Sequence, residues 1–338
     1  SVVLIVVLLI FVAYILYADR KIWAAVQMRR GPNVVGPFGL LQSFADMLKF
    51  VLKEIVVPAG ADKTVFLLAP IITVILAFMA WAVIPFAPGW VMSDLNVGIL
   101  YIFAVSSLGV YGIIMGGWAS NSKYPFLGAL RSAAQMISYE VTLGLSLAGL
   151  ILIYGTLDLN EMVRMQGTQL GGWLPMWGVV VQPVAFFVFF LAGMAETKRA
   201  PFDLPESESE LVAGYITEYS SMSFGAMQLG EYAATVMIGA LVAILFFGGW
   251  QVPYLYGDGF HFGTPNGTPD LALNYYVVIL LRIGSMIVKT LFFVWLQFMM
   301  RWTLPRFRYD QVMTLGWKIL LPLSLANLVI TAIVAAIL

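Results

Sequence analysis

The chain of 338 residues is 61% hydrophobic and only 11% charged, whereas globular domains are roughly 45–50% apolar and about 25% charged. A soluble core cannot absorb this excess of apolar side chains, so the surplus must face lipid. Eighteen basic and eighteen acidic residues balance, which leaves no net charge to attract nucleic acid.

The sequence contains no cysteine and a single histidine, His261. Iron–sulfur clusters need thiolates, and haem usually takes at least one histidine ligand. We therefore predict that the chain holds no metal, and that any electrons belong to a small molecule or a partner subunit. His261 lies in a loop rich in Gly, Pro and Asp, where we predict an ordinary polar surface position.

Eight apolar stretches approach the roughly 20 residues that a transmembrane helix needs. They cover residues 1–17, 64–85, 97–118, 132–154, 176–195, 226–248, 275–299 and 315–337. The first ends in Asp19-Arg20-Lys21 without a small-residue cleavage site, so it is a span and not a signal peptide. Because Ser1 already lies inside this run, we expect residues before it. The prediction is an all-α polytopic membrane protein with a single integral membrane domain over residues 1–338.

The basic residues are distributed unevenly between the two sides. Fifteen of the eighteen lie in or beside the loops that follow the first, third, fifth and seventh spans, and the other loops hold only Arg164. Basic loops mark the cytoplasmic side. We therefore expect both chain termini on the outer, periplasmic side.

Residues 39–53 have the pattern of an amphipathic helix. Apolar side chains recur at Leu40, Phe44, Met47 and Val51, while Asp46 and other polar residues fall on the opposite face. The pattern is typical of a helix lying at the membrane surface. An ordinary surface helix packed on the other spans has the same pattern, and the two interpretations are compatible.

The loop over residues 196–225, with its continuation to 231, carries an unusual number of acids. Seven carboxylates stand among two basic residues: Glu196, Asp203, Glu206, Glu208, Glu210, Glu218 and Glu231. Crowded carboxylates titrate as a set and can take up or release protons when a nearby charge changes. A solvated acidic surface is the simpler interpretation, but interleaved apolar residues such as Phe202 and Leu211 favour a functional one.

Charged residues also lie within the spans. Arg131, Gln135 and Tyr139 form a polar stripe that leads to Glu140 in the fourth span, and Arg282 and Lys289 lie in the seventh. Ionisable groups at membrane depth cost about 2.5–3.5 kcal/mol each on insertion scales and usually face a bundle interior or a water-filled cavity. A proton path is the natural hypothesis, and snorkelling or structural ion pairs are the alternative.

Several long segments carry a family resemblance. GLLQSFADMLKFVLKE (39–54) and PFDLPESESELVAGYITEYS (201–220) resemble the two signature segments of the H subunit of respiratory complex I, the NADH:quinone oxidoreductase. The resemblance extends to RRGPNVVGPFG (29–39), SNSKYPFLGALRSAAQMISYE (120–140) and PRFRYDQ (305–311), and it covers nearly the whole chain in order.

This resemblance implies a membrane protein that forms much of the quinone chamber and couples quinone reduction to proton translocation. By motif position, the residues implied to line the chamber are Arg20, Arg29, Arg30, Asp46, Arg199, Phe202, Asp203, Glu206, Glu208 and Glu210. Those implied to form the proton path are Arg131, Glu140, Glu218, Glu231 and Lys289.

The same resemblance implies a quinone, ubiquinone in particular, as substrate, and places flavin and iron–sulfur clusters on other subunits. The expected partners are the peripheral-arm quinone-site subunits, neighbouring membrane-arm subunits and lipid. The expected location is a bacterial cytoplasmic membrane or the mitochondrial inner membrane.

Three positions depart from the common family pattern: Asp19 replaces Glu, Lys198 replaces Asn, and Ser207 replaces Gly or Ala. None removes an acid from the implied path. The alternatives are the homologous membrane subunit of a nickel–iron hydrogenase complex, a stand-alone ion transporter and a structural anchor. We see no inverted repeat of the kind found in many transporters.

Overall fold

The computed structural model describes residues 2–170, 174–204, 212–261 and 270–337. Seven helices in this part of the chain are long and apolar enough to cross a membrane. An eighth apolar stretch is divided between α7 (Gly178–Val181) and α8 (Pro183–Glu196). The predicted all-α polytopic fold is confirmed.

The seven long helices follow one another along the chain. They are α1 (Val2–Val26), α3 (Lys63–Met79) with its extension η2 (Ala80–Val83), α4 (Gly98–Ala119), α5 (Lys123–Tyr154), α10 (Ser221–Phe246), α11 (Tyr275–Thr303), and the continuous helix of α12 (Tyr309–Thr314), η4 (Leu315–Leu320) and α13 (Leu321–Ile337). Short helices connect them: η1 (Pro37–Gly39), α2 (Gln42–Leu52), α6 (Leu159–Gln166) and η3 (Gly214–Ile216). Two small antiparallel hairpins pair β1 (Gln169–Leu170) with β2 (Leu174–Pro175), and β3 (Gly259–Phe260) with β4 (Leu271–Ala272).

Local sequence explains several of these boundaries. The Asp62 carboxylate caps α3 by accepting from the backbone N–H groups of Thr64 and Val65, at 3.0 and 3.2 Å. Gly155 ends α5 in the left-handed conformation, with φ of 66°, which glycine adopts without steric cost. At its other end α5 starts at Lys123, nine residues before the predicted span.

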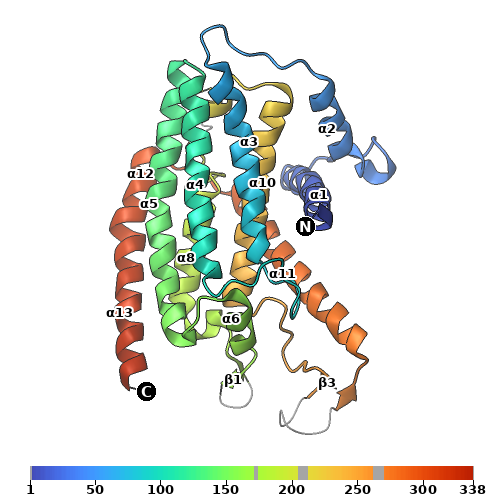
Figure 1. Ribbon diagram of the computed structural model, residues 1–338, viewed down its shortest axis with the longest axis vertical. Helices are drawn as coiled ribbons and strands as arrows, with labels where there is room; N and C mark the ends of the chain where they lie inside the picture. The colour runs from blue at the N-terminus through green and yellow to red at the C-terminus, as the bar shows by residue number, and fades with distance from the viewer. Residues whose placement is uncertain (1, 171–173, 205–211, 262–269, 338) are drawn as a thin grey trace.

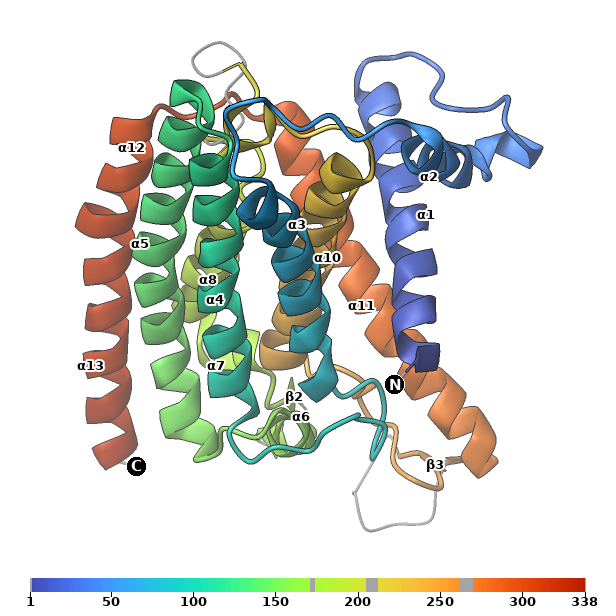
Figure 2. The same ribbon diagram turned by 45° about the horizontal axis from the view of Figure 1, so that its top comes forward.

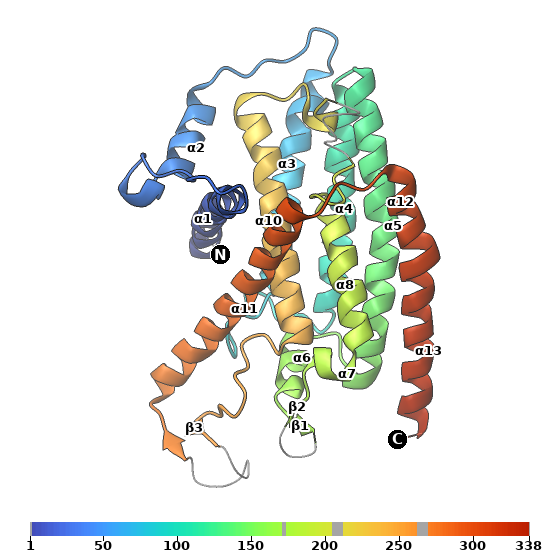
Figure 3. The same cartoon turned by 180° about the vertical axis from the view of Figure 1, so that it is seen from behind.

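The helices form one bundle with two inclined members. α3, α4, α5 and α10 stand side by side, α13 packs against α5, and α1 and α11 are tilted relative to this group (Figures 1 and 3). Figure 2 shows that both termini lie at one end of the bundle. The loops after α1, α4, α8 and α11 lie at the other end, which we call the basic end because it carries most of the basic residues.

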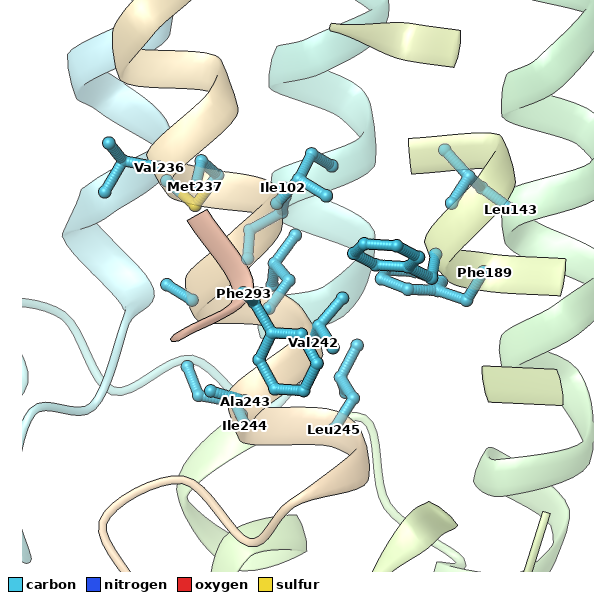
Figure 4. Packing of buried hydrophobic residues seen from close by; sticks show 14 of the residues in the cluster. Ile102, Leu143, Phe189, Val236, Met237, Val242, Ala243, Ile244, Leu245 and Phe293 are labelled. Carbon is cyan, nitrogen blue, oxygen red and sulfur yellow. The ribbon is translucent and has the colours of Figure 1, made fainter. Parts of the chain in front are cut away.

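α10 is the central helix of the bundle. In its most apolar stretch of 18 residues, 89% of the residues are buried, whereas the corresponding share for the α12–α13 helix is 17%. Glycines allow close approach here: Gly230 faces Thr73 of α3, and Gly239 faces Val294 of α11. Figure 4 shows Phe189 of α8 and Phe293 of α11 against the apolar side chains of α10.

Hydrogen bonds fasten α13 to the junction of α7 and α8. The Gln182 side-chain amide donates to Thr331 Oγ1 at 2.6 Å, and Asn327 donates to Gln182 Oε1 at 2.7 Å. Polar side chains are common links between membrane helices because lipid offers no competing partners.

Candidate functional site

A cavity of about 110 Å³ lies inside the bundle between α3, α4, α5, α8 and α10. Its walls are mostly apolar, but Glu196, Lys198 and Glu231 line it together with Ser106. A cavity of this volume has room for several water molecules, and its few polar side chains offer hydrogen-bond partners for them. It therefore provides a place where water and titratable side chains meet within the membrane-spanning part of the protein.

Glu231 is the most heavily paired acid at this cavity. It lies in α10, within the predicted span 226–248, and its side chain is only 4% exposed. The Arg199 guanidinium lies 3.1 Å from Glu231 Oε2, the Lys198 ammonium lies 4.0 Å from Oε1, and the Tyr215 hydroxyl donates to Oε1 at 2.5 Å. Two cations and one hydroxyl thus satisfy a single buried carboxylate.

Two further carboxylates continue the network towards α4 and α5. Glu196 ends α8, is partly exposed to the cavity and is hydrogen-bonded to Ser106. Glu140 of α5 is close enough to interact with the Glu196 charge, and it accepts a hydrogen bond from Ser107. The structure therefore brings together Glu140 and Glu231, two acids of the predicted proton path, with Glu196 between them.

A second buried acid joins the network from the side of α1. Asp19 is 2% exposed and accepts hydrogen bonds from Tyr232 at 2.8 Å, Arg301 at 2.9 Å and the Trp302 indole at 2.7 Å. The guanidinium of Arg199 lies over the Tyr232 ring, 4.3 Å from its centroid. Tyr232 thus connects the Asp19 group to the Arg199–Glu231 pair. We call the whole set the buried charge network: Asp19, Glu140, Glu196, Lys198, Arg199, Glu231 and Arg301, with Tyr215 and Tyr232.

The predicted residues near the first span form a separate group at the basic end. Arg20 of α1 pairs with Asp46 of α2 at 2.5 Å, and Asp46 also accepts from Gln42 at 3.2 Å. Arg29 and Arg30 are exposed, and Arg29 lies over the Trp23 ring. The Arg20–Asp46 pair therefore fixes α2 beside the end of α1.

α2 meets the bundle with its polar side and part of its apolar side. Phe44 contacts Tyr14 edge to face, with centroids 5.9 Å apart, and Ser221 donates to the backbone carbonyl oxygens of Phe50 and Lys53. Leu48 and Val51 remain 58% exposed. The helix therefore packs on the other spans, and its exposed apolar side is suited to the membrane surface, which remains a prediction.

The acidic loop is described only in part. Phe202 is buried against Tyr139 and Phe307, and Asp203 pairs with Arg306 at 2.8 Å. Glu206, Glu208 and Glu210 lie outside the described residues. Glu218 is half-buried after η3, and no ion pair between described residues joins it to the buried charge network.

The polar stripe on α5 has a structural role. The Gln135 amide donates to the carbonyl oxygens of Ala195 at 2.6 Å and Phe202 at 2.8 Å, and the Tyr139 hydroxyl donates to Val312 at 2.7 Å. Arg131 lies over the ring of Tyr309. The stripe holds the end of α8 and the start of α12, and it leads towards Glu140.

Lys289 lies apart from the other predicted proton-path residues. Its ammonium donates to three backbone carbonyls just past the end of α10: Phe247 at 2.7 Å, Gly249 at 2.9 Å and Gln251 at 2.6 Å. Phe247 follows Glu231 by 16 residues, which is about 24 Å along a helix. The structure thus places Lys289 at the opposite end of α10, where it satisfies free carbonyls.

The prediction of a surface position for His261 is wrong. The side chain is buried with 3% of the residue exposed, and its Nε2 lies 2.8 Å from Asp258 Oδ1. The hydrogen bond to His261 lowers the pKa of Asp258 below its ordinary value. His261 therefore organises its loop and is not a solvated side chain.

Several members of the network were absent from the predicted site residues: Asp19, Glu196, Lys198, Tyr215, Tyr232 and Arg301. Asp19 and Lys198 were recognisable only as departures from the family pattern, and Glu196 as one acid among seven. Tyr232 and Arg301 show no distinguishing local signal, because their role arises from contact between α1, α10 and α11.

A bundle of membrane helices with carboxylates, basic residues and a cavity in its interior defines a multi-pass membrane protein with an ionisable core. The sequence matches the NADH dehydrogenase family over residues 1–332. The chain is 56% identical to the H subunit of the NADH-quinone oxidoreductase of Maricaulis maris, over 95% of this chain and 89% of that protein. The corresponding H subunits of Caulobacter vibrioides (54% identical, 97% and 90% covered) and Agrobacterium fabrum (56%, 99% and 92%) are similar. The chain belongs to this family.

Proposed function

We propose that this chain is a membrane subunit of an NADH-quinone oxidoreductase that forms much of the quinone chamber and couples quinone reduction to proton translocation. Membership of the family of NADH-quinone oxidoreductase H subunits supports the assignment to that complex. The single structural observation that carries the coupling role is the buried charge network, which runs from Asp19 through Glu231 to Glu140.

The quinone enters from the bilayer near the first span and α2. This part of the basic end has exposed apolar side chains on α2 beside the Arg20–Asp46 pair. An isoprenoid tail suits the apolar surface, while the charged pair suits a polar headgroup. Arg29, Arg30, Phe202 and Asp203 contribute to the same chamber in this proposal, as do Glu206, Glu208 and Glu210.

Reduction of a quinone to a quinol takes up two electrons and two protons. The electrons come from partner subunits, because the sequence holds no cysteine for an iron–sulfur cluster. The change of charge in the chamber acts on the buried charge network, whose four carboxylates face three basic side chains. With all groups ionised the network carries one net negative charge, and one bound proton neutralises it. The network can therefore hold a proton when the chamber contains one redox state of the quinone and release it when the chamber contains the other.

The proposed path runs from Glu231 through Glu196 to Glu140, with the cavity supplying the water between them. It continues to neighbouring membrane-arm subunits, and peripheral-arm subunits cover the basic end. Glu218 and Arg131 lie near the mouth of this path in the proposal. Lys289 supports the far end of α10. The membrane is a bacterial cytoplasmic membrane, with both termini outside.

The test is substitution of Glu140 in the assembled complex. Glu140→Gln keeps the size of the side chain and removes its charge, so we expect quinone reductase activity and proton pumping to fall at least tenfold. NADH oxidation by an artificial acceptor that bypasses the quinone should remain unchanged. Glu54→Gln is the matched control, because Glu54 is exposed and lies outside the network. Wild-type quinone reduction and pumping in Glu140→Gln would contradict the coupling role.

Copurification separates this proposal from its alternatives. Mild solubilisation and capture of the chain should recover flavin and iron–sulfur subunits with inhibitor-sensitive NADH:quinone activity. Recovery of nickel–iron subunits in their place would indicate the hydrogenase relative. A chain recovered alone would indicate a transporter.

A further inference from the structure

A second cavity lies at the end of the bundle opposite the basic end. It has a volume of about 450 Å³ and lies between the end of α6, the β1–β2 hairpin, the loop after α10 and the first turns of α11. The described residues that line it include two arginines and no acid. The lining side chains that matter here are Arg164, Trp177, Tyr254, Tyr256 and Arg282.

Among the described residues, no carboxylate lines the cavity beside Arg282. Its guanidinium lies 5.1 Å from the centroid of the Trp250 ring, and its Nη2 makes a long hydrogen bond of 3.4 Å to the Leu255 carbonyl. The Nε–H group is buried and has no hydrogen-bond partner within the part of the chain that the structure describes. A buried donor without an acceptor is costly, more so when it carries charge.

Two other basic side chains lie on the elements around Arg282. Arg164 is the only basic residue in the loops at this end, and its side chain is exposed at the cavity. Lys289, two turns further along α11, contacts backbone carbonyls and a tryptophan ring. Among the described residues no ion pair neutralises any of these three cations.

The depth of the cavity matches that of lipid headgroups. Arg282 follows the first residue of α11 by seven positions, about 10 Å along the helix. Trp177, Tyr254 and Tyr256 line the cavity beside it, and Trp and Tyr gather at the membrane–water interface. Arginine presents a planar fork of N–H donors that matches the oxygens of a phosphate group.

We propose that this cavity binds the phosphate group of a phospholipid from the adjacent leaflet, held by Arg282 and Arg164. The phosphate supplies an acceptor for the buried Nε–H and a counter-charge for both arginines. The aromatic side chains contact the glycerol backbone. This site is independent of the proposed quinone and proton chemistry, which lies at the other end of the bundle.

The experiment measures how phospholipid protects the arginines from chemical modification. The purified complex is delipidated with detergent and treated with phenylglyoxal, and the modification of Arg282 and Arg164 is read by peptide mass spectrometry. Three probes are added separately: phosphatidylglycerol, diacylglycerol with the same acyl chains, and inorganic phosphate. We expect phosphatidylglycerol to slow the modification of Arg282 at least fivefold, and the other two probes at equal concentration to leave it unchanged.

Substitutions sharpen this test. Arg164→Gln should weaken the protection of Arg282 by phosphatidylglycerol, and Arg308→Gln, which removes an exposed arginine at the basic end, should preserve it. Equal protection by inorganic phosphate would overturn the lipid site in favour of a small-anion site. Equal protection by diacylglycerol, or no protection by any probe, would overturn the phosphate site itself.

Discussion

The Glu231 group offers a quantitative test of the buried charge network. Glu231→Gln keeps the shape of the side chain but takes the Glu231 charge away from the buried cations of Arg199 and Lys198. At an effective dielectric constant of about 20, unit charges at 3.1 and 4.0 Å attract by roughly 5 and 4 kcal/mol. Desolvation offsets much of this attraction when the pair is intact. Removing one partner of a buried pair therefore costs about 3–5 kcal/mol net.

The assay is the rate at which the detergent-solubilised complex dissociates at a fixed temperature, followed by gel filtration. If the whole loss lowers the barrier to dissociation, about 3 kcal/mol accelerates it roughly 100-fold. The exposed control Glu54→Gln should stay within about 0.5 kcal/mol of the unchanged protein. The double variant Glu231→Gln/Arg199→Gln removes both members of the pair. We expect it to lose about 0.5–3 kcal/mol less stability than the sum of the two single losses, because residues in contact are energetically coupled.

Two outcomes would refute this reasoning. A Glu231→Gln complex that dissociates at the unchanged rate would mean that the cations are satisfied without the carboxylate. A double variant whose loss equals the sum of the single losses would mean that Glu231 and Arg199 do not interact energetically.

Three further predictions concern the structural polar groups. Lys289→Met should free the carbonyls past the end of α10 and make the following loop at least tenfold more sensitive to protease, whereas the exposed Lys318→Met should not. Gln182→Leu should lower stability by about 1–3 kcal/mol, measured as faster dissociation, because two interhelical hydrogen bonds are lost; unchanged kinetics would count against the bonds. The hydrogen bond to His261 lowers the pKa of Asp258, so its stabilising effect is present above the ordinary aspartate pKa of about 3.9 and is lost as pH falls through the lowered value. His261→Ala should therefore increase hydrogen exchange in this loop at pH 6, and an unchanged exchange pattern would contradict the role of the bond.

Sequence alone determined the spans, the membrane class and the family. Lipid cannot satisfy backbone hydrogen bonds, and a helix satisfies its own. Each helical crossing therefore needs a long apolar run that is visible in the sequence. The division of the fifth span at Gln182 and Pro183 and the early start of α5 depended on local packing, whereas Glu231 already fell within the predicted span 226–248. The family resemblance implied Glu140, Glu231 and Arg199 as site residues, but it contained no information on their pairing.

The tertiary structure decided which charges meet. Glu231 lies 32 positions from Arg199, and Asp19 lies 282 positions from Arg301, so no local pattern could pair them. The same packing places the Lys289 ammonium among backbone carbonyls, with which it forms hydrogen bonds. It also buries the His261 side chain in its loop. Hydropathy depends on each residue by itself and is readable along the chain. Electrostatic pairing depends on distances of a few ångströms between helices, and these exist only once the bundle has packed.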